Sequence, residues 1–539
     1  MPRRPTQPLW NVLALDRASA TSLQDQIVAF FRDAVLRGAL KPGARLPSSR
    51  QLAADLGVAR ITAVEAFDRL AAEGYFVTRR GVGLFVADTV TDAYLSGLPT
   101  RVPRGRKGSA TPAPAIARAS SSAVANWHTP SDTRPSARAA VAIPAGPQTA
   151  AGATRAGSSS DPHAPRGHES PTADALPLAT GVPALEEFPW KDWARISARV
   201  FRDRPAAALA YGDPQGLPEL RSAIADYLGA ARGIVCDPDQ IVVVSGSQQG
   251  IDLTARVVAS PGEAAWFEDP GYGAARAALA AARLKVALVP ADRDGIDVAR
   301  GIADAPTARL AVVTPSYHYP LGGTLSLPRR RALLAWAHAT GAWILEDDYY
   351  GEYRFAGRPQ LPLYALDRHA RVLYLGTFSK MLAPGLRIGF VVAPRPLVQR
   401  LTDLKSSTDR YTPGLMQLVL ARFISEGRLA AHVRRMRTLY RERRAALLDA
   451  LATRASDVLD VGEPPDAGLH VAVRLKVDVD DVAVSRDVRK LGISAAPLSS
   501  YYAGTPKVRG FVLGFANTPA ADSTRAITAL ARRVRLAAR

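Results

Sequence analysis

The sequence predicts a multidomain protein in which a mainly helical N-terminal module with a short β-wing precedes an α/β domain with a large, mostly parallel sheet. The first 88 residues show helical periodicity and then strand-like alternation. The next segment loses every periodic apolar pattern. Beyond it, apolar strand-like runs alternate with helical segments, which is typical of parallel sheets. We therefore predict two domains, 1–88 and 176–539, joined by a linker at 89–175.

Length, charge and cysteine content set the broad class of the chain. A chain of 539 residues exceeds a single hydrophobic core, so several domains are expected. Its formal charge of +20 favours a polyanionic partner, although a coding bias toward arginine gives the same balance. Cys236 is the only cysteine, which excludes an intrachain disulfide and a cysteine-cluster zinc site. We expect a cytoplasmic protein with no membrane anchor and no metal.

The N-terminal module is predicted helix by helix. Residues 22–40 place apolar side chains on one helical stripe. A second, short helix begins in SSRQLAADL and ends at Gly57, and a third helix, ARITAVEAFDRLAAEG, stops at Gly74. The segment YFVTRRGVGLFVAD then alternates like two strands around a turn at 79–83. Helix, helix, tight turn, helix and hairpin together predict a winged helix-turn-helix.

Residues 89–175 are rich in alanine, proline and serine, as in RPSARAAVAIPAGPQTAAGATRAGSSSDPHAPRG. Such a composition buries too little apolar surface to offset the entropy of ordering. We predict a disordered, basic linker that lets the flanking domains hold variable positions.

The C-terminal domain is predicted from its apolar runs. They are QIVVVSGS, AAWFEDPGY, RLAVVTPSY, AWILEDDYY, RVLYLGTFSK and IGFVVAP. From Gly414 onward the chain becomes mainly helical, with short strands in LHVAVRL and GFVLGFA. This tail predicts a smaller α+β subdomain after the large sheet.

One lysine follows a predicted strand in the stretch TFSKMLAPGLRIGF, residues 377–390. Ligand sites in open α/β sheets gather at the carboxyl ends of strands. A primary amine beside hydroxyl groups and an arginine suits a Schiff base to an aldehyde whose phosphate those groups hold. Pyridoxal 5'-phosphate fits that description, and Asp347, at the end of a neighbouring strand, suits its ring nitrogen.

These motifs carry a resemblance to a known family. Residues 176–539 resemble a fold-type I aminotransferase domain, and residues 20–88, with PSSRQLAADLGV, resemble a GntR-type winged helix. Together they resemble the MocR subfamily of bacterial transcription regulators. The resemblance implies a C-terminal domain of the pyridoxal-phosphate-dependent transferase fold type I, with pyridoxal 5'-phosphate as cofactor, and a homodimer that binds double-stranded operator DNA.

The resemblance also implies roles for site residues. Lys380 would form the Schiff base, Asp347 would pair with the pyridinium, and Tyr349 would lie near the cofactor's O3'. Tyr272 would lie over the ring, and Tyr211 would reach across a dimer interface to the partner's phosphate. The alternatives are an arginine-paired Asp347 and purely packing roles for Tyr272 and Tyr211.

The phosphate would be held by a second set of residues. It combines side chains with backbone N–H groups at a helix start. Its members are Thr377, Ser379, Arg387, Gly246, Ser247 and Gln248.

In the winged helix, the third helix is expected in the major groove, with the wing along the backbone. Arg60 and Thr62 are the candidates for base contacts, the alternative being an ordinary helix surface. The expected phosphate and wing residues are Arg45, Ser48, Arg50, Arg79, Arg80 and Gly83. Many relatives have SRNTV where this chain has ARITA, so two usual donors are replaced by Ala59 and Ile61.

Departures from the enzyme pattern favour a sensor. Val512 stands where amino-acid-using relatives carry an arginine, Ala274 stands where some sensors carry another, and Tyr319 stands where transaminases carry asparagine. We predict a regulator whose operator binding depends on the occupancy of Lys380 by the cofactor or an amine ligand, with vitamin B6 or amino-compound metabolism as targets. The alternatives are an active aminotransferase with an appended DNA-binding module, and a DNA-binding dimer that has lost the cofactor.

Overall fold

A computed structural model describes residues 15–17, 22–36, 40, 43–72, 75–79, 83–86, 176–203, 205–355, 361–464 and 466–539. The predicted linker at 89–175 and the wing residue Arg80 lie outside these ranges. Within them, no helix combines the length and the apolar character that a bilayer crossing requires.

The N-terminal domain is a winged helix-turn-helix, as predicted. Strands β1 and β2 pair antiparallel, from Phe76 opposite Val86 to Arg79 opposite Gly83. The first helix ends at Leu36, short of the predicted residue 40. The elements are α1 (Leu23–Leu36), α2 (Ser49–Leu56), α3 (Arg60–Ala72), β1 (Phe76–Arg79) and β2 (Gly83–Val86).

Aromatic packing and helix caps hold this domain together. The ring of Phe31 in α1 lies 5.6 Å from that of Phe67 in α3 and 5.7 Å from that of Phe76 in β1, in edge-on contacts. Ser48 caps α2 by accepting a hydrogen bond from the Gln51 N–H at 3.1 Å. Gly57 ends α2 at a φ of +61°, a conformation that favours glycine and turns the chain toward α3.

In the described part of the C-terminal domain, the large sheet has eight strands in the order β3-β10-β9-β8-β7-β4-β5-β6. Only β10 and β6 run antiparallel to their neighbours, so the sheet is mostly parallel, as predicted. Its strands are β3 (Ile241–Val244), β4 (Ala264–Asp269), β5 (Lys285–Asp292), β6 (Gly295–Ile296), β7 (Leu310–Val313), β8 (Trp343–Asp347), β9 (Val372–Thr377) and β10 (Gly389–Val392).

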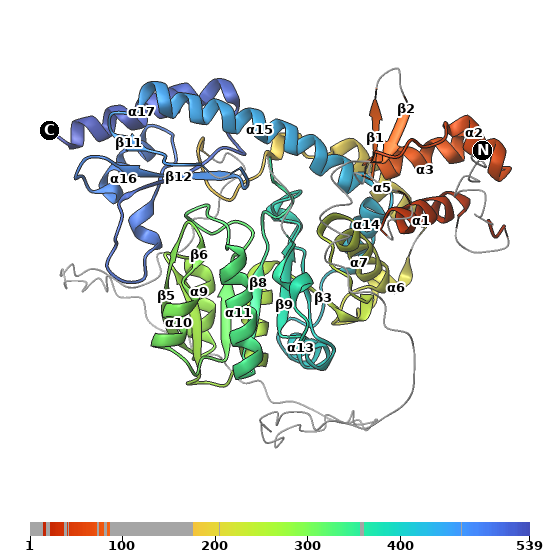
Figure 1. Cartoon of the computed structure of the whole chain (residues 1–539), viewed down its shortest axis with the longest axis horizontal. Helices are drawn as coiled ribbons and strands as arrows, with labels where there is room; N and C mark the ends of the chain where they lie inside the picture. Colours follow the sequence, from red (N-terminus) through yellow and green to blue (C-terminus); the bar gives the residue numbers. More distant parts are fainter. Residues whose placement is uncertain are drawn as a thin grey trace, which may run out of the picture. The chain divides into compact units, whose positions relative to one another are not determined.

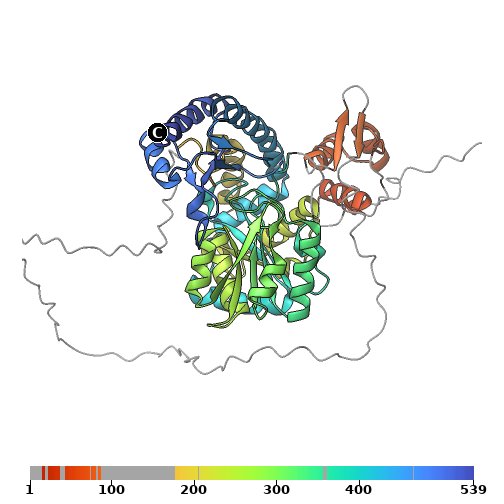
Figure 2. The ribbon, with the colours of Figure 1, turned by 60° about the vertical axis from the view of Figure 1, so that its left-hand side comes forward.

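Helices cover both faces of this sheet (Figures 1 and 2). Phe267 and Val312 pack with one set of helices, whereas their chain neighbours Trp266 and Ala311 pack on the opposite face. This alternation explains why the strands are apolar on both sides. The first set is α8 (Ser247–Val258), α9 (Gly273–Ala281) and α13 (Arg395–Thr408), and the second is α10 (Val298–Asp304), α11 (Leu327–Thr340) and α12 (Leu363–Leu366).

The smaller subdomain has an antiparallel sheet in the order β11-β12-β14-β13. The long helix α15 packs along α17 beside this sheet (Figure 1). These elements confirm the predicted α+β tail. They are α15 (Arg428–Arg454), β11 (Leu459–Asp460), β12 (His470–Leu475), α16 (Asp481–Lys490), β13 (Ala496–Pro497), η5 (Leu498–Tyr501), β14 (Gly510–Gly514) and α17 (Ala520–Ala537).

A further group of helices joins the two sheets. Helix α14 packs on both α5 and α7, and their apolar faces share one core cluster with the small subdomain. These elements are η2 (Leu185–Glu187), α5 (Trp190–Arg202), α6 (Ala206–Leu209), α7 (Pro218–Arg232), η3 (Pro238–Gln240), η4 (Pro384–Leu386) and α14 (Gly414–Ser425).

The sheet topology brings the chemically useful strand ends together. Asp347 at the end of β8 pairs in register with Leu375 of the adjacent β9. Gly389 of β10 stands between Val244, the last residue of β3, and Thr377, the last residue of β9. The polar residues after β3, β8 and β9 therefore meet at one edge of the sheet.

Candidate functional site

Lys380 lies in the turn after β9. Its Nζ donates a hydrogen bond to the Gly181 carbonyl at 2.6 Å. The pKa of Lys380 is lowered to about 8, mainly by burial, with Asp347 opposing the shift and the nearby Arg387 adding to it. A lysine with this pKa is neutral in a larger fraction near pH 7 than a surface lysine, and the neutral amine is the nucleophile.

Asp347 ends β8 in a buried position. Its Oδ1 atom has no hydrogen-bond partner among the described residues. The pKa of Asp347 is raised to about 7, mainly by burial and also by the negative charge of Asp348, whereas Lys380 opposes the shift. A protonated ring nitrogen would supply both the missing donor and a compensating positive charge, so the position fits the cofactor role.

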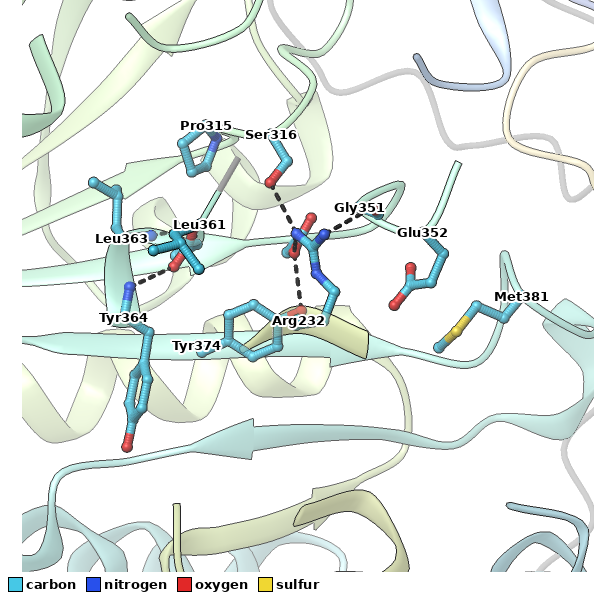
Figure 3. A network of polar contacts seen from close by, with 12 residues as sticks. Arg232, Pro315, Ser316, Gly351, Glu352, Leu361, Leu363, Tyr364, Tyr374 and Met381 are labelled. Carbon is cyan, nitrogen blue, oxygen red and sulfur yellow. Dashed lines mark hydrogen bonds and ion pairs between the residues drawn. The ribbon is translucent and has the colours of Figure 1, made fainter. Parts of the chain in front are cut away.

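The arginine pairing that the sequence left open for Asp347 occurs one residue later. Figure 3 shows Arg232, the last residue of α7, at the centre of a buried polar network. Its guanidinium contacts the Asp348 carboxylate and donates to the Gly351 carbonyl at 2.8 Å. The Tyr374 hydroxyl donates to Asp348 at 2.9 Å. This network fixes the chain at Asp347 and keeps a negative charge beside it.

We call the group around the start of α8 the phosphate end of the site. Gly246 precedes α8 at a φ of +103°, and an added Cβ there would lie 3.0 Å from Nη2 of Arg387. That nitrogen donates to the Ser245 carbonyl at 2.8 Å. The free N–H groups of Ser247 and Gln248 and the positive end of the helix dipole make this a place for an anion.

Thr377 and Ser379 lie between the phosphate end and Lys380. The Ser379 N–H donates to Oγ1 of Thr377 at 3.2 Å, so the threonine hydroxyl keeps its own hydrogen for another acceptor. The Gln248 side chain, in contrast, donates to the Ala274 carbonyl at 2.9 Å. One of the two N–H donors of the Gln248 side chain is therefore already used.

Charged residues beyond the predicted set hold the phosphate end. The Ser245 hydroxyl donates to Asp409 at 3.2 Å, and the fully buried Lys405 donates to the same carboxylate at 2.7 Å. Lys405 thus neutralises an acid that stands close to the anion position. Neither Lys405 nor Asp409 belongs to a local sequence motif. In the sequence they lie one helical turn apart, which is the spacing of an ordinary surface ion pair.

The predicted ring contacts lie in a cluster of tyrosines. We call this cluster of Tyr272, Tyr317, Tyr319 and Tyr349, together with Lys380 and Asp347, the ring end of the site. The pKa of Tyr272 is raised to about 12, mainly by burial and also by Asp347 and Tyr319, whereas Arg387 at the phosphate end opposes the shift. The Tyr272 ring stands edge-on to that of Tyr319 at 5.8 Å. The Tyr349 hydroxyl donates to the Tyr317 carbonyl at 2.8 Å, which leaves its oxygen as an acceptor.

Three residues of the ring end were missed in the sequence. Gly181 accepts from Lys380, the Tyr501 hydroxyl lies 2.9 Å from that of Tyr319, and the His470 ring lies 5.3 Å from the Tyr319 ring. They come from segments far apart in the chain. No local pattern joins them to the lysine motif, and only the tertiary packing does so.

Tyr211 lies apart from the ring end within one chain. It is 89% exposed and lines a surface hollow with Asp409, Arg410 and Tyr411. Because Asp409 also bonds Ser245, this hollow adjoins the phosphate end. The place of Tyr211 in a dimer stays a prediction.

The winged helix exposes most of its predicted DNA-binding residues. Arg60 begins α3 and is exposed, and Ile61 beside it is 61% exposed, where an apolar side chain can meet a thymine methyl. The Ser48 hydroxyl is engaged as the cap of α2. Arg45 pairs with Phe85 in an isolated bridge, and its side chain lies beside Gly83 of the wing. Arg50 and Thr62 lie on α2 and α3, and Arg79 ends β1.

Two family models match this chain. The model of the class I and II aminotransferases matches residues 173–530, and the model of the gntR family of bacterial regulatory proteins matches residues 23–86.

Full-length relatives share both parts. The probable rhizopine catabolism regulatory protein MocR of Rhizobium meliloti is 35% identical, over 94% of this chain and 92% of that protein. The pyridoxine biosynthesis transcriptional regulator PdxR of Corynebacterium glutamicum is 31% identical, over 93% of this chain and 94% of that protein.

Solved structures match the C-terminal domain. The kynurenine aminotransferase of Pyrococcus horikoshii is 30% identical with a TM-score of 0.62, over 68% of this chain and 92% of that one. The alpha-aminoadipate aminotransferase LysN of Thermus thermophilus is 29% identical with a TM-score of 0.62, over 67% and 92%. These likenesses confirm the predicted fold of the C-terminal domain.

Proposed function

The chain belongs to the MocR-type regulators, in which a GntR winged helix precedes a class I and II aminotransferase domain, and we propose that the occupancy of Lys380 controls its binding to operator DNA. It is a DNA-binding transcription regulator, and its cofactor is pyridoxal 5'-phosphate. The proposal concerns how the two activities are coupled, which residues serve each, and the dimer in which they act in the cytoplasm.

One observation supports the cofactor site above all. A lysine of lowered pKa, a buried carboxylate with an unpartnered oxygen and a helix start with an arginine meet at the ends of three strands. When bound, the cofactor supplies an electrophilic aldehyde that takes up primary amines. Lys380 would supply the amine that reacts with the aldehyde, Asp347 would pair with the ring nitrogen, and Arg387 with the start of α8 would bind the phosphate.

The remaining site residues assist this arrangement. Thr377 and Ser379 give hydroxyl groups to the phosphate, and Tyr272 and Tyr349 confine the ring. Thr377 is buried and the other three are half-buried, so they restrict the access of water, which strengthens each electrostatic contact.

Coupling to DNA requires two states of the protein with different ligand affinity. A ligand shifts such an equilibrium by no more than its differential affinity for the two states. We propose a homodimer in which Tyr211 reaches the partner's phosphate end, so that the ligand biases the dimer and the spacing of its two winged helices. The names of MocR and PdxR support amino-compound or vitamin B6 metabolism as the regulated pathway.

The cofactor site is tested by titrating the purified full-length protein with pyridoxal 5'-phosphate. We expect a visible absorption band and, after borohydride reduction, a label on Lys380. Lys380→Ala removes both, whereas Lys191→Ala, at an exposed position of α5, retains both. A colourless wild-type protein that takes up no label would contradict the proposal.

For the DNA surface, we propose Arg60 and Thr62 as base contacts, with Arg45, Ser48, Arg50, Arg79, Arg80 and Gly83 along the backbone and wing. Arg60→Ala should weaken operator binding by about 1–3 kcal/mol and leave non-specific binding nearly unchanged. An unchanged ratio of specific to non-specific affinity would exclude base contact by Arg60.

A second candidate function is transamination, because the likeness to solved aminotransferases extends over 92% of their chains. Against it, Val512 is fully buried in β14, and Ala274 is the second residue of α9, so neither supplies a cation for a substrate carboxylate. Sustained turnover of an amino acid with an oxo acid would support the enzyme function.

A further inference from the structure

We propose that this site selects amine ligands that carry a hydroxyl group, and that His470 accepts the hydrogen bond from that hydroxyl. The inference rests on the proposed function, since the ligand must reach the cofactor at Lys380. His470 is the first residue of β12 in the small subdomain and is fully buried.

The tautomer of His470 is fixed by its surroundings. Its Nε2 lies 3.0 Å from the Pro320 carbonyl oxygen, which can only accept, so Nε2 carries the hydrogen. The pKa of His470 is lowered to about 4, mainly by burial and to a lesser degree by Lys380, against the opposing effect of the hydrogen bond to Pro320, so the ring is neutral near pH 7. Its Nδ1 is therefore a bare acceptor, and it has no hydrogen-bond partner among the described residues.

His470 belongs to the ring end of the site. Its neighbour Tyr319 also stands edge-on to the Tyr272 ring at 5.8 Å, and Lys380 acts to lower the pKa of His470. Its ring stands edge-on to the rings of Tyr317 at 5.0 Å and Tyr319 at 5.3 Å. The Tyr317 hydroxyl also donates to the His470 carbonyl, so both the backbone and the ring are held in place.

The rings that contact His470 belong to uncharged tyrosines. In register, His470 stands opposite Gly514 and Ala472 stands opposite Val512, so His470 and the apolar Val512 share one face of the small sheet. The hydroxyls of Tyr319 and Tyr501 bond each other and Thr180, and burial is the main cause that raises the pKa of both tyrosines.

This chemistry discriminates between ligand classes. A hydroxyl can donate a hydrogen bond to the bare Nδ1 atom of His470, whereas a carboxylate has no hydrogen to donate and its lone pairs would repel that of Nδ1. A carboxylate would also lose its hydration beside these uncharged rings. An aliphatic group would leave the Nδ1 atom unpaired in a buried site. The structure therefore favours amino alcohols over amino acids and over simple alkylamines.

The test uses the full-length protein loaded with pyridoxal 5'-phosphate and three amines of similar length: 3-aminopropanol, β-alanine and n-butylamine. Affinity is measured from the change in the visible spectrum and from the shift in melting temperature. We expect 3-aminopropanol to bind at least about tenfold more tightly than either of the others. Equal or tighter binding of β-alanine, or no response to 3-aminopropanol at millimolar concentration, would overturn the inference.

The variant His470→Gln tests the assigned atom. Its amide keeps a donor for the Pro320 carbonyl and removes the acceptor at Nδ1. We expect a loss of about tenfold in the affinity for 3-aminopropanol and little change for n-butylamine, with the cofactor band retained. The control is His338→Gln, in α11, whose ring stacks on His369 away from the site and should leave all three affinities unchanged.

The results distinguish failure of the His470 assignment from failure of the proposed cofactor site. An equal loss for 3-aminopropanol and n-butylamine in His470→Gln would show a structural role for the histidine and overturn the assignment. If this variant does not fold, the selectivity of the wild-type protein alone decides the inference. Failure of the wild-type protein to take up the cofactor would instead overturn the proposed function itself.

Discussion

The phosphate end of the site is open and positively polarised, whereas the ring end is buried and holds a lysine and a carboxylate with few partners. At the phosphate end, Arg387 is exposed and already bonded to the Ser245 carbonyl. At the ring end, burial shifts the pKa values of Lys380 and Asp347 toward their neutral forms. The phosphate end is therefore already arranged to bind an anion, whereas the ring end is destabilised until its ligand binds.

Replacing Asp347 tests the ring end most strongly. Asp347→Asn removes a charged partner of the ring nitrogen, so the cofactor should bind about 10- to 100-fold more weakly, or about 1.5–3 kcal/mol. Without cofactor, the variant should be more stable than the wild-type protein, because a buried unpaired acid is gone. Spectral titration and thermal unfolding measure the two effects. Unchanged cofactor affinity would remove Asp347 from the site.

At the phosphate end, the corresponding change is Gly246→Ala. The φ of +103° is strained for alanine, at a cost of about 1–3 kcal/mol, and the new Cβ pushes on Arg387. We expect weaker cofactor binding together with lower stability. The control is Gly273→Ala at the start of α9, where an added Cβ meets nothing within 4 Å. Equal behaviour of the two variants would contradict the close approach at Gly246.

The smallest effect is a pH dependence of the cofactor-free protein. The raised pKa of Asp347, about 7 against 3.8, gives stability that is present below pH 3.8 and lost as the pH rises through about 7. The lowered pKa of Lys380, about 8 against 10.5, gives stability that is present above pH 10.5 and lost as the pH falls through about 8.

The ring end should therefore be least stable between about pH 7 and 8. Thermal unfolding of wild-type protein and Asp347→Asn between pH 5 and pH 8 measures the part that belongs to Asp347. Glu268 and Glu346, whose pKa values burial raises to about 7, contribute to the same slope in both proteins. Identical slopes would show that Asp347 is not buried as described.

The sequence predicted what local motifs encode. Lys380, Asp347 and Gly246 each follow an apolar strand, and parallel strands bring such ends together, so their meeting follows from the pattern. The hairpin at 79–83 was likewise visible in alternation and glycine. Strands β5 and β6 were not predicted, because the apolar run of β5 contains Pro290, which counts against a strand, and β6 has only two residues.

What the sequence could not predict depends on long-range packing. Arg232 ends a helix 116 residues before its partner Asp348, and no sequence motif at either residue indicates the ion pair. His470 and Tyr501 reach the site only because the small subdomain folds against the large one. The tautomer of a histidine depends on its hydrogen-bond partners. The bare Nδ1 atom of His470 is therefore a result of the contact with the Pro320 carbonyl, and no sequence motif indicates it.

The account is tested most directly by the operator affinity of the full-length protein with and without pyridoxal 5'-phosphate, measured in parallel for wild-type protein and Lys380→Ala. We predict that the cofactor changes the operator affinity of the wild-type protein at least about fivefold, the lower end of typical coupling between sites, and leaves that of Lys380→Ala unchanged. An affinity that is insensitive to the cofactor in wild-type protein, or that responds equally in both proteins, would contradict control through Lys380.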